Sequence, residues 1–243
     1  MGMIEVVDFK KSFGAKVVHN GVTFYVKKGE CLGLIGGSGA GKSVILRSLI
    51  GLEKPDEGRI IIDGENIAAM RENELVGVRK KVAYVFQGGA LFDSMTVYEN
   101  LAYPLREHTR MEETAIKNRI LEQLAEFGLQ GSESLYPGNL SGGMQKRVGL
   151  ARAMMMNPEI VLYDEPTAGL DPYNTKVIQE HILNLKNRGV TSILVTHDMP
   201  TAFAVCDKLA FLLKGRIGAQ GTLEELKKDP QGLITKFING EAS

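Results

Sequence analysis

The feature that most constrains this chain is the glycine-rich segment Gly36–Ser43, which reads Gly-Gly-Ser-Gly-Ala-Gly-Lys-Ser. It fits the G-x-x-x-x-G-K-[ST] pattern of a phosphate-binding loop. Cys31–Ile35 before it is typical of a short buried strand, and Val44–Ile50 after it is typical of a helix. In this setting several backbone N–H groups and the positive end of a helix dipole converge on one point, which favours a polyphosphate. The segment therefore predicts a nucleotide site.

We expect this loop to bind ATP and Mg²⁺. Lys42 would reach the β- and γ-phosphates, and the Ser43 hydroxyl would bind Mg²⁺. A glycine-rich turn that binds nothing is the alternative, although the pattern should arise by chance at only about one position in 10⁴ to 10⁵. The loop residues expected to contact ATP are Gly36, Gly37, Ser38, Gly39, Ala40, Gly41, Lys42 and Ser43.

The bulk composition is that of an ordinary globular protein. At 243 residues the chain could form one large domain or two small ones around a real core. Lysine plus arginine and aspartate plus glutamate balance at 29 each, so no long-range field favours a nucleic acid or an anionic membrane, and we expect no nucleic-acid partner. The N-terminus does not have the pattern of a signal peptide, and the apolar runs are too short to span a bilayer. A role at a membrane would therefore require a partner.

The two cysteines, Cys31 and Cys206, each lie in an apolar context. No spaced Cys/His cluster accompanies them, so buried free thiols are favoured over a metal site. Thiols of this kind suit a reducing cytosol.

Hydrophobic patterning predicts an α/β fold. Alternating residues at Ile4–Phe9 and Gly21–Val26 are typical of a half-solvated antiparallel sheet, which Arg59–Ile62 is expected to join before an Asp63-Gly64 turn. Buried strands that alternate with helices imply βαβ units and a mostly parallel second sheet. Strands covered on both faces are expected at Val82–Phe86, Ile160–Tyr163 and Ser192–Val195, and helices at Glu112–Phe127, Gly142–Met156 and Pro172–Arg188.

We expect a single unit over residues 1–243, built from three parts. Residues 1–88 and 158–220 would form the α/β core with its antiparallel β subdomain and a final hairpin, Lys208–Leu213 with Gly215–Gln220. Residues 89–157 contain no convincing strand and are expected to form an inserted helical subdomain. Residues 221–243 would form a tail of two short helices, the second starting near Pro230.

Two carboxylates, Asp164 and Glu165, follow the predicted strand Ile160–Tyr163. Ligands of open α/β sheets bind at the carboxyl ends of the strands. We expect Asp164 to bind the Mg²⁺ ion and Glu165 to polarise the attacking water. An acidic turn that only caps the strand is the alternative, and the phosphate-binding loop makes it the weaker interpretation.

Gln87 and His197 also follow predicted strands, so they are expected at the same edge of the sheet. The Gln87 amide could contact Mg²⁺ or water, and His197 could donate to the γ-phosphate or orient Glu165. Either residue could instead be an ordinary structural residue at a strand end. Their combination with the phosphate-binding loop and the carboxylates favours a functional role.

The sequence Leu140–Gln145 opens the helix predicted from Gly142. Ser141 fits the N-cap position, and the paired glycines Gly142 and Gly143 would let a ligand approach the helix N-terminus closely. A capped helix start without a ligand is the alternative.

In combination, these segments resemble the ATPase subunits of ABC transporters over nearly the whole chain. The resemblance implies a P-loop NTPase with a RecA-like core, in which two subunits enclose two ATP molecules head to tail. The matching features, in the order and spacing of the family, are the loop Gly36–Ser43, Gln87, the signature Leu140–Met144, Asp164–Glu165, Ala168–Asp171 and His197.

The resemblance also implies roles for these residues. Lys42, Glu165 and His197 would be catalytic, with Ser43, Gln87 and Asp164 around the metal. The signature residues Ser141, Gly142 and Gly143 of one subunit would complete the ATP site of the other, and Asp171 would communicate across the dimer. Phe13 occupies the position of the aromatic residue that stacks on adenine, without a tyrosine hydroxyl. Met144 replaces the commoner Gln, and we do not expect this change to abolish activity.

Two segments, Gly89–Val97 and Asn100–Thr109, resemble the ATPases of Mla/Mce-type phospholipid-trafficking transporters, as do the Leu-Ser-Gly-Gly-Met signature and the ending Phe237–Gly240. This resemblance implies a homodimer of ATPase subunits at the cytoplasmic face of the inner (plasma) membrane, bound to an integral membrane permease and an Mce-domain lipid-binding protein. A small regulatory subunit could join them. In this family the surface after Gln87 receives the permease. The alternative is that these segments are generic helical-subdomain residues.

Other functions stay open at this point. The chain could serve another ABC transporter, such as an amino-acid importer or a lipoprotein-release system, which the segment from Gly89 to Thr109 argues against. A soluble ABC protein of translation or DNA repair usually has tandem cassettes or a long coiled-coil insertion, and the sequence shows neither. The apolar tail residues Leu233, Ile234, Phe237 and Ile238 recur at helical spacing, and could pack on their own subunit or dock on the neighbouring one.

Overall fold

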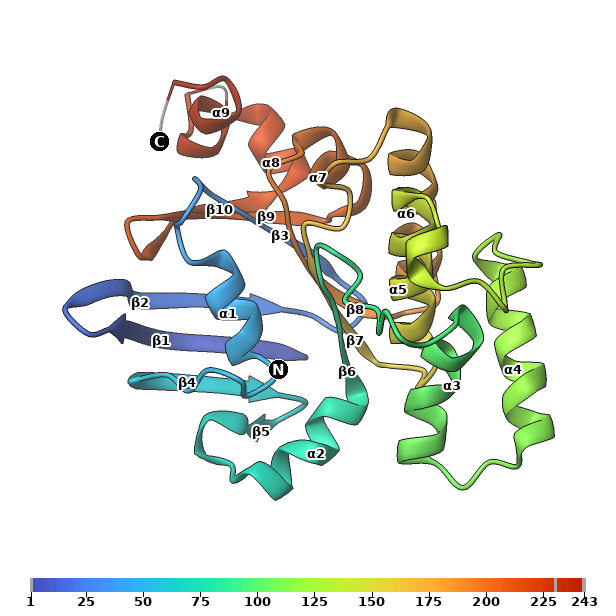
Figure 1. Cartoon of the computed structure of the whole chain (residues 1–243). Coiled ribbons are helices and arrows are strands. Elements are labelled where there is room, and N and C mark those ends of the chain that lie inside the picture. Colours follow the sequence, from blue (N-terminus) through green and yellow to red (C-terminus); the bar gives the residue numbers. More distant parts are fainter. Residues whose placement is uncertain (1, 230, 242–243) are drawn as a thin grey trace.

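The computed structural model describes residues 2–229 and 231–241, in which two sheets and their helices form one body (Figure 1). The first sheet is antiparallel. Its strands, in spatial order, are β2 (Lys16–Val26), β1 (Ile4–Phe13), β4 (Glu57–Ile62) and β5 (Glu65–Asn66). The second is parallel apart from β10. Its order is β10 (Arg216–Thr222), β9 (Lys208–Leu213), β3 (Cys31–Ile35), β8 (Thr191–Val195), β7 (Ile160–Asp164) and β6 (Val82–Val85).

Helices surround the parallel sheet and fill the space between the sheets (Figure 1). They are α1 (Lys42–Ser48), α2 (Glu72–Lys81), α3 (Val97–His108), α4 (Glu113–Glu126), α5 (Gly142–Met154), α6 (Pro172–Asn187), α7 (Met199–Val205), α8 (Leu223–Lys228) and α9 (Leu233–Ile238), with short 3-10 turns at Ile67–Ala69 and Pro137–Asn139. None of these helices, within the described residues, combines the length and the hydropathy needed to cross a bilayer. The predicted α/β fold with one antiparallel and one mostly parallel sheet is confirmed.

Side chains of the parallel sheet alternate between two separate apolar clusters. On β7, Leu162 faces α1 and the antiparallel sheet, whereas Val161 and Tyr163 face the helices on the other side. Cys31 and Cys206 lie in this second cluster as buried free thiols, with 3.7 Å between their sulfur atoms. Their predicted burial is confirmed.

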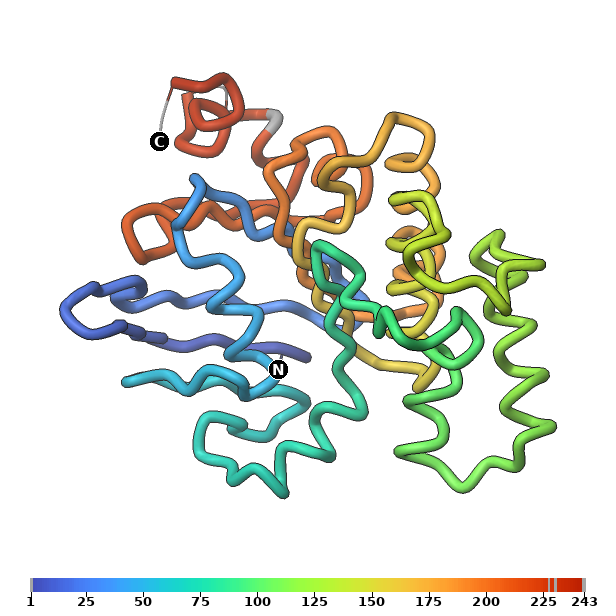
Figure 2. Tube along the Cα trace, in the orientation of Figure 1, coloured from blue at the N-terminus to red at the C-terminus, as the bar shows by residue number. Residues whose placement is uncertain are grey.

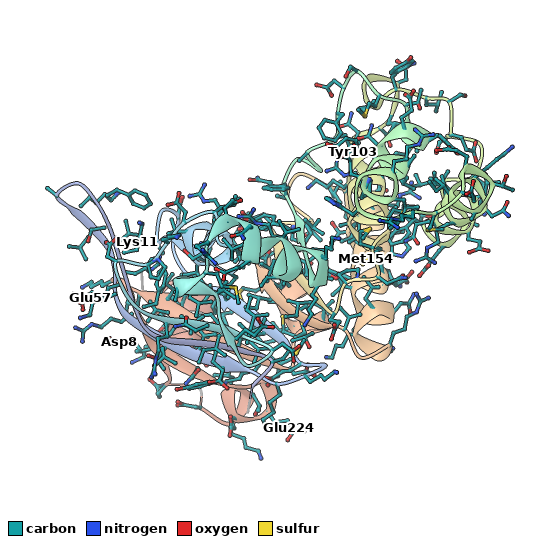
Figure 3. The ribbon with its side chains drawn as sticks, turned by 90° about the horizontal axis from the view of Figure 1, so that it is seen from below. Asp8, Lys11, Glu57, Tyr103, Met154 and Glu224 are labelled. Atoms are coloured by element: carbon teal, nitrogen blue, oxygen red, sulfur yellow. The ribbon has the colours of Figure 1, made fainter. Side chains whose placement is uncertain are left out.

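Three predicted strands differ clearly from the structure in length or in burial. The strands expected at Ile4–Phe9 and Gly21–Val26 extend toward each other as a long ribbon of β1 and β2. Irregular register along this ribbon breaks the period of two that sequence patterning relies on. The antiparallel sheet carries charged residues such as Asp8 and Lys11 on β1 and Glu57 on β4, which Figure 3 shows on one side of the molecule, away from Tyr103 and Met154. The third strand, β6, ends at Val85 and is an edge strand with partly exposed side chains, not a strand covered on both faces.

The stretch between β6 and β7 is helical, as expected for residues 89–157. Figure 2 shows the chain leaving the parallel sheet after β6, building α3, α4 and α5 to one side, and returning to β7. The predicted boundaries of the three parts stay predictions. The helices predicted at Glu112–Phe127, Gly142–Met156 and Pro172–Arg188 agree with α4, α5 and α6 within two residues, but α2, α3 and α7 were not predicted as individual helices.

The C-terminal hairpin of β9 and β10 is confirmed, and two short helices follow it. Pro230, where the second helix was expected to start, lies outside the described residues, and α9 begins at Leu233. Ile234 is buried in the main cluster, and the Phe237 ring lies 4.6 Å from that of Phe211 on β9. These tail residues therefore pack on their own subunit.

Candidate functional site

A cleft with a volume of about 600 Å³ lies at the carboxyl ends of β3, β7 and β8, where the phosphate-binding loop joins α1. The structure brings together here the loop, Phe13, Gln87, both carboxylates and His197. Ser141, Gly142, Gly143 and Asp171 do not line it. The cleft is lined by Phe13, Lys16, Val18, Gly36, Ser38, Gly39, Gly41, Lys42, Ser43, Val44, Gln87, Asp164, Glu165, Val195 and His197.

The phosphate-binding loop folds around the Lys42 side chain. The Lys42 ammonium group donates to the carbonyl oxygens of Gly36 and Gly37 over 2.9 and 3.0 Å. Burial lowers the pKa of Lys42, and the carboxylates of Glu165 and Asp164 oppose this shift. The cleft thus holds a half-buried cation whose present partners are neutral, and an anionic ligand would be a better partner.

Asp164 is held by two hydroxyl groups. The Ser43 hydroxyl donates to Asp164 Oδ1 over 3.0 Å, and the Tyr84 hydroxyl donates to Oδ2 over 2.7 Å. Burial and this hydrogen bond raise the pKa of Tyr84 above its ordinary range, so the phenol stays protonated and remains a donor. Tyr84 was missed in the sequence, where the available signal was a single hydroxyl in an apolar strand.

Glu165 is fixed by its backbone and by His197. Its φ angle is +52°, in the left-handed region that is unfavourable for a residue with a side chain, and its N–H donates to the Val195 carbonyl over 2.9 Å. His197 Nδ1 lies 2.9 Å from Glu165 Oε1. The side chain of His197 is 71% exposed and that of Glu165 only 15%, so the carboxylate is mostly covered while its histidine partner faces solvent.

Phe13 and Gln87 lie at the edges of the cleft. Phe13 is 44% exposed at the end of β1, and the Lys11 ammonium group lies 5.2 Å from its ring centroid, within cation–π range. Gln87 follows the edge strand β6 and is exposed. Both side chains are accessible to a ligand in the cleft, as their predicted contacts with ATP and metal require, and those contacts stay predictions.

Away from this cleft, the signature segment and Asp171 are joined through one residue, Asn174. Ser141 caps α5 and accepts a hydrogen bond from the Met144 N–H over 3.3 Å. Asn174 packs on Gly143 so tightly that a Cβ at Gly143 would lie 2.4 Å from its side-chain oxygen. The Asn174 amide donates to Asp171 over 2.5 Å, and hydrogen bonds from Asn174 lower the pKa of Asp171. The two predicted dimer elements thus share one contact residue, which sequence reasoning missed.

Two other residues near the cleft were missed. Lys146 on α5 donates to the Ala168 carbonyl, and burial lowers its pKa while Glu165 opposes the shift. This contact ties the signature helix to the loop after Glu165. His19 lies behind the phosphate-binding loop, with Nε2 3.1 Å from the Gly41 carbonyl oxygen. Neither residue belongs to a pattern that sequence alone would single out.

Residues 19–168 match the protein family described as ABC transporter. The chain is 42% identical over 238 residues to the probable ribonucleotide transport ATP-binding protein Mkl of Mycobacterium tuberculosis H37Rv, covering 98% of this chain and 66% of that relative, just under two thirds of its length. It is 36% identical over 241 residues to the intermembrane phospholipid transport system ATP-binding protein MlaF of Escherichia coli K12, covering 99% of this chain and 90% of MlaF.

Solved structures of ATP-binding cassettes superpose on this chain. A dimeric ATP-binding cassette in a post-hydrolysis state, bound to ADP and Pi, superposes with a TM-score of 0.85 at 32% identity, covering 91% of this chain and 99% of that chain. A nucleotide-free ATP-binding cassette from an ABC transporter superposes with a TM-score of 0.85 at 28% identity, covering 98% of this chain and 99% of that chain.

Proposed function

Because this chain belongs to the ABC transporter family, we propose that two copies of it hydrolyse ATP and drive a membrane permease that moves phospholipid between membranes. The observation that carries the chemistry is the convergence of three groups in one cleft: the Lys42 ammonium, the Ser43–Asp164 pair and the Glu165–His197 pair. Similarity to MlaF over 99% of the chain supports the cargo.

Lys42 would bind the β- and γ-phosphates of ATP. Its ammonium group would exchange the carbonyl oxygens of Gly36 and Gly37 for phosphate oxygens, which carry full negative charge. A positive charge held in a partly desolvated site stabilises the charge of phosphoryl transfer more strongly than the same charge in water.

Ser43, Asp164 and Gln87 fit Mg²⁺, because all three offer the oxygen atoms that this ion prefers, usually together with phosphate oxygens and water. The Ser43 and Asp164 oxygens already lie 3.0 Å apart. When bound, Mg²⁺ would supply neutralisation of the phosphate charge. Tyr84 would keep the Asp164 carboxylate oriented toward it.

Glu165 would act as the general base. Its carboxylate would accept a proton from a water molecule that attacks the γ-phosphorus, and the bond from that phosphorus to the bridging oxygen would break to give ADP and phosphate. His197 would hold the carboxylate in place during the attack, through its ring and through its main-chain N–H, which donates to Glu165 Oε2 over 3.3 Å.

A second copy of the chain would complete the site. Ser141, Gly142 and Gly143 do not line the cleft of their own subunit, and we propose that they contribute to the cleft of the other one. The dimeric cassette with ADP and Pi supports this arrangement. Asp171, which contacts Asn174 beside Gly143, would lie at the same interface and communicate between the subunits.

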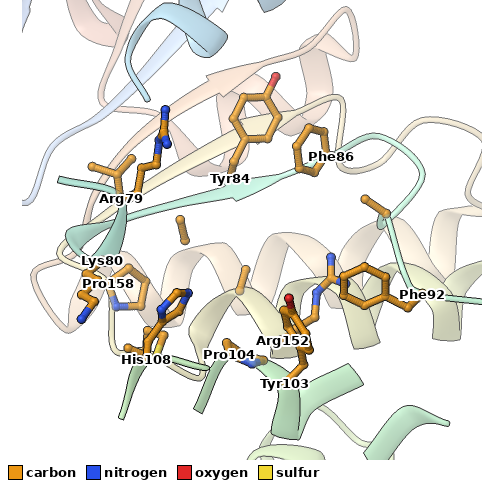
Figure 4. A pocket seen from close by; sticks show the side chains of 15 residues that line it. Arg79, Lys80, Tyr84, Phe86, Phe92, Tyr103, Pro104, His108, Arg152 and Pro158 are labelled. Carbon is orange, nitrogen blue, oxygen red and sulfur yellow. The ribbon is translucent and has the colours of Figure 1, made fainter. Parts of the chain in front are cut away.

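A groove with a volume of about 410 Å³ between β6, α3 and α5 is our candidate for the permease surface. Figure 4 shows Phe86, Phe92 and Tyr103 around it, together with the cationic residues Arg79, Lys80 and Arg152. An apolar groove edged by cationic groups suits an amphipathic helix that carries acidic residues. The groove is connected to the ATP cleft, because Phe86 stacks on Tyr84 with 4.2 Å between ring centroids and Tyr84 bonds Asp164.

We propose that the assembly lies at the cytoplasmic face of the inner (plasma) membrane and includes an Mce-domain lipid-binding protein besides the permease. A small regulatory subunit would be a further component. A second candidate cargo is a ribonucleotide, because the mycobacterial relative of 42% identity is named for ribonucleotide transport. The greater share of MlaF covered, 90% against 66%, favours phospholipid.

The test has two stages. First, phosphate release from ATP is compared for the wild type, Lys42→Ala and the control Lys117→Ala, which changes an exposed lysine on α4. We expect turnover to be lost only in Lys42→Ala, and equal turnover in all three would overturn the ATPase assignment. Second, the detergent-solubilised complex is isolated from its native host through a tag on this chain. Retained phospholipid, permease and Mce-domain protein would support the proposal, whereas a bound ribonucleotide cargo or a ribosomal partner would contradict it.

A further inference from the structure

The phosphate-binding loop rests on a buried histidine of the antiparallel sheet. His19 on β2 has a fully buried side chain, at 0% exposure, and its Nε2 lies 3.1 Å from the Gly41 carbonyl oxygen. Gly41 immediately precedes Lys42 and is the N-cap of α1. The His19 side chain therefore connects the antiparallel sheet to Gly41, the N-cap residue at which α1 begins.

The contact specifies the protonation of the ring. A carbonyl oxygen can only accept, so His19 Nε2 carries the proton and donates it. Among the described residues, Nδ1 is buried without a hydrogen-bond partner. A second proton on Nδ1 would create a buried cation with an unsatisfied donor, and burial accordingly lowers the pKa of His19, opposed by the bond to Gly41. His19 is thus a neutral donor with one fixed tautomer.

The ring also fits tightly against the loop. Gly41 has a φ angle of +94°, and a Cβ there would lie 2.6 Å from both His19 Nε2 and Val18 Cγ1. On its other side the imidazole packs at a tilt against Phe9, with 5.3 Å between ring centroids. The imidazole is therefore confined between the core of the antiparallel sheet and the Gly41 backbone.

The strand that carries His19 is also held by the turn between β9 and β10. The N–H of Asn20 donates to the Gly215 carbonyl, in the turn between β9 and β10, over 2.8 Å. Gly215 approaches β2 so closely that a Cβ there would lie 2.8 Å from the Val18 carbonyl oxygen. His19 is thus positioned by both sheets, and it can transmit that position to the loop.

We propose that His19 is a positioning residue for nucleotide binding, which holds the Gly41–Lys42 peptide so that its N–H faces the phosphates. In a planar trans peptide the C=O and the N–H point in opposite directions. The Gly41 carbonyl also accepts from the N–H groups of Val44 and Ile45 in α1, over 2.9 and 3.3 Å. His19 would reinforce this orientation from the antiparallel sheet, so that the Lys42 N–H of the same peptide points away from His19. This inference rests on the proposed function, since it assumes that ATP is the ligand.

The experiment measures binding of ATP with Mg²⁺ to the full-length chain by calorimetry. His19→Phe keeps a ring beside Phe9 and removes the donor, and we expect it to weaken binding about five- to tenfold, as for the loss of one buried hydrogen bond. His19→Gln restores an amide donor near the position of Nε2, and we expect it to recover binding to within about twofold of the wild type. His181→Phe is the matched control, because this histidine stacks on Phe127 away from the cleft, and its affinity should stay at the wild-type value.

The outcomes separate this inference from the proposed function. A wild type that binds no ATP refutes the proposed function itself. A wild type that binds ATP while His19→Phe binds equally well, or while His19→Gln is as weak as His19→Phe, overturns the role of His19. Should His19→Phe fail to fold, NMR of the imidazole nitrogens in the wild type still decides the matter. Protonation at Nε2 and a shift of that resonance on addition of ATP are expected, and protonation at Nδ1 or an unmoved resonance would refute the inference.

Discussion

Both carboxylate oxygens of Glu165 are held by one residue, His197. The imidazole Nδ1 lies 2.9 Å from Oε1, and the main-chain N–H donates to Oε2 over 3.3 Å. A carboxylate accepts but does not donate when ionised, so Nδ1 of the imidazole carries the proton in this contact. The histidine therefore fixes the orientation of the Glu165 carboxylate. Substitutions of Glu165 and of His197 test the two residues separately.

Replacing Glu165 with glutamine should leave ATP binding intact and slow hydrolysis at least about a hundredfold, because the amide cannot accept a proton from water. Since the nucleotide is then not consumed, two copies should remain associated around it. Phosphate release and light scattering after gel filtration with ATP measure the two effects. Turnover close to the wild-type rate would remove Glu165 as the general base.

His197→Ala should slow turnover about tenfold or more, while the affinity for ATP changes less than about twofold, because the histidine acts through Glu165. His197→Asn places an amide donor near the position of Nδ1 and should recover part of the rate. Single-turnover kinetics and equilibrium binding distinguish the two quantities. An affinity that falls as far as the rate would indicate that His197 contacts the nucleotide directly.

Tyr84→Phe removes one hydroxyl and keeps the ring that stacks on Phe86. We expect the Mg²⁺ concentration for half-maximal ATPase activity to rise about threefold to tenfold, because Asp164 loses a donor that fixes its orientation. The melting temperature should change little. An unchanged Mg²⁺ titration would show that the hydroxyl does not orient Asp164.

Two adjacent glycines should respond oppositely to alanine. A Cβ on Gly143 would lie 2.4 Å from the Asn174 side-chain oxygen, whereas a Cβ on Gly142 meets nothing within 4 Å. We expect Gly143→Ala to lower the free energy of unfolding by about 1 to 2 kcal/mol through overpacking. Gly142→Ala should leave it unchanged or raise it by up to about 1 kcal/mol through helix propensity. Urea titrations of both variants measure the difference, and equal stabilities would contradict the close contact.

Two adjacent residues of the C-terminal helix α9 differ in burial and should differ in their effect on stability. Ile234 is 1% exposed and Leu233 is 40% exposed. Ile234→Ala should lower the free energy of unfolding of the isolated chain by about 2 to 4 kcal/mol, because it opens a cavity beside the β9–β10 hairpin. Leu233→Ala should cost less than about 1 kcal/mol. If Ile234→Ala instead leaves the single chain unchanged and weakens the dimer, the tail belongs to the neighbouring subunit.

Much of the cleft could be predicted because each of its parts is recognisable from a short stretch of sequence. The strand, turn and helix around Lys42 follow one another along the chain, and Asp164, Glu165 and His197 each follow a buried parallel strand. Parallel strands carry their carboxyl ends to one edge, so their polar residues meet there without further information.

Contacts between different helices and strands could not be predicted from the sequence. His19, Tyr84, Lys146 and Asn174 reach their partners only because of how the sheets and helices pack, and nothing in their neighbouring residues shows it. Helix α2 was not predicted for a different reason. It buries only Leu75 and Val78, so its sequence has only a weak apolar periodicity. The long β1–β2 ribbon was shortened because its irregular register disturbs the alternation of side chains.

The alternation along β7 also has a mechanical consequence. Leu162 and Tyr163 are neighbours in the chain but belong to different apolar clusters, and Asp164 follows them at the cleft. Because these two neighbours lie in different clusters, a displacement of β7 would change the packing on both sides of the sheet. If the proposed metal ion displaces Asp164, the strand would carry that displacement to the helical side of the sheet.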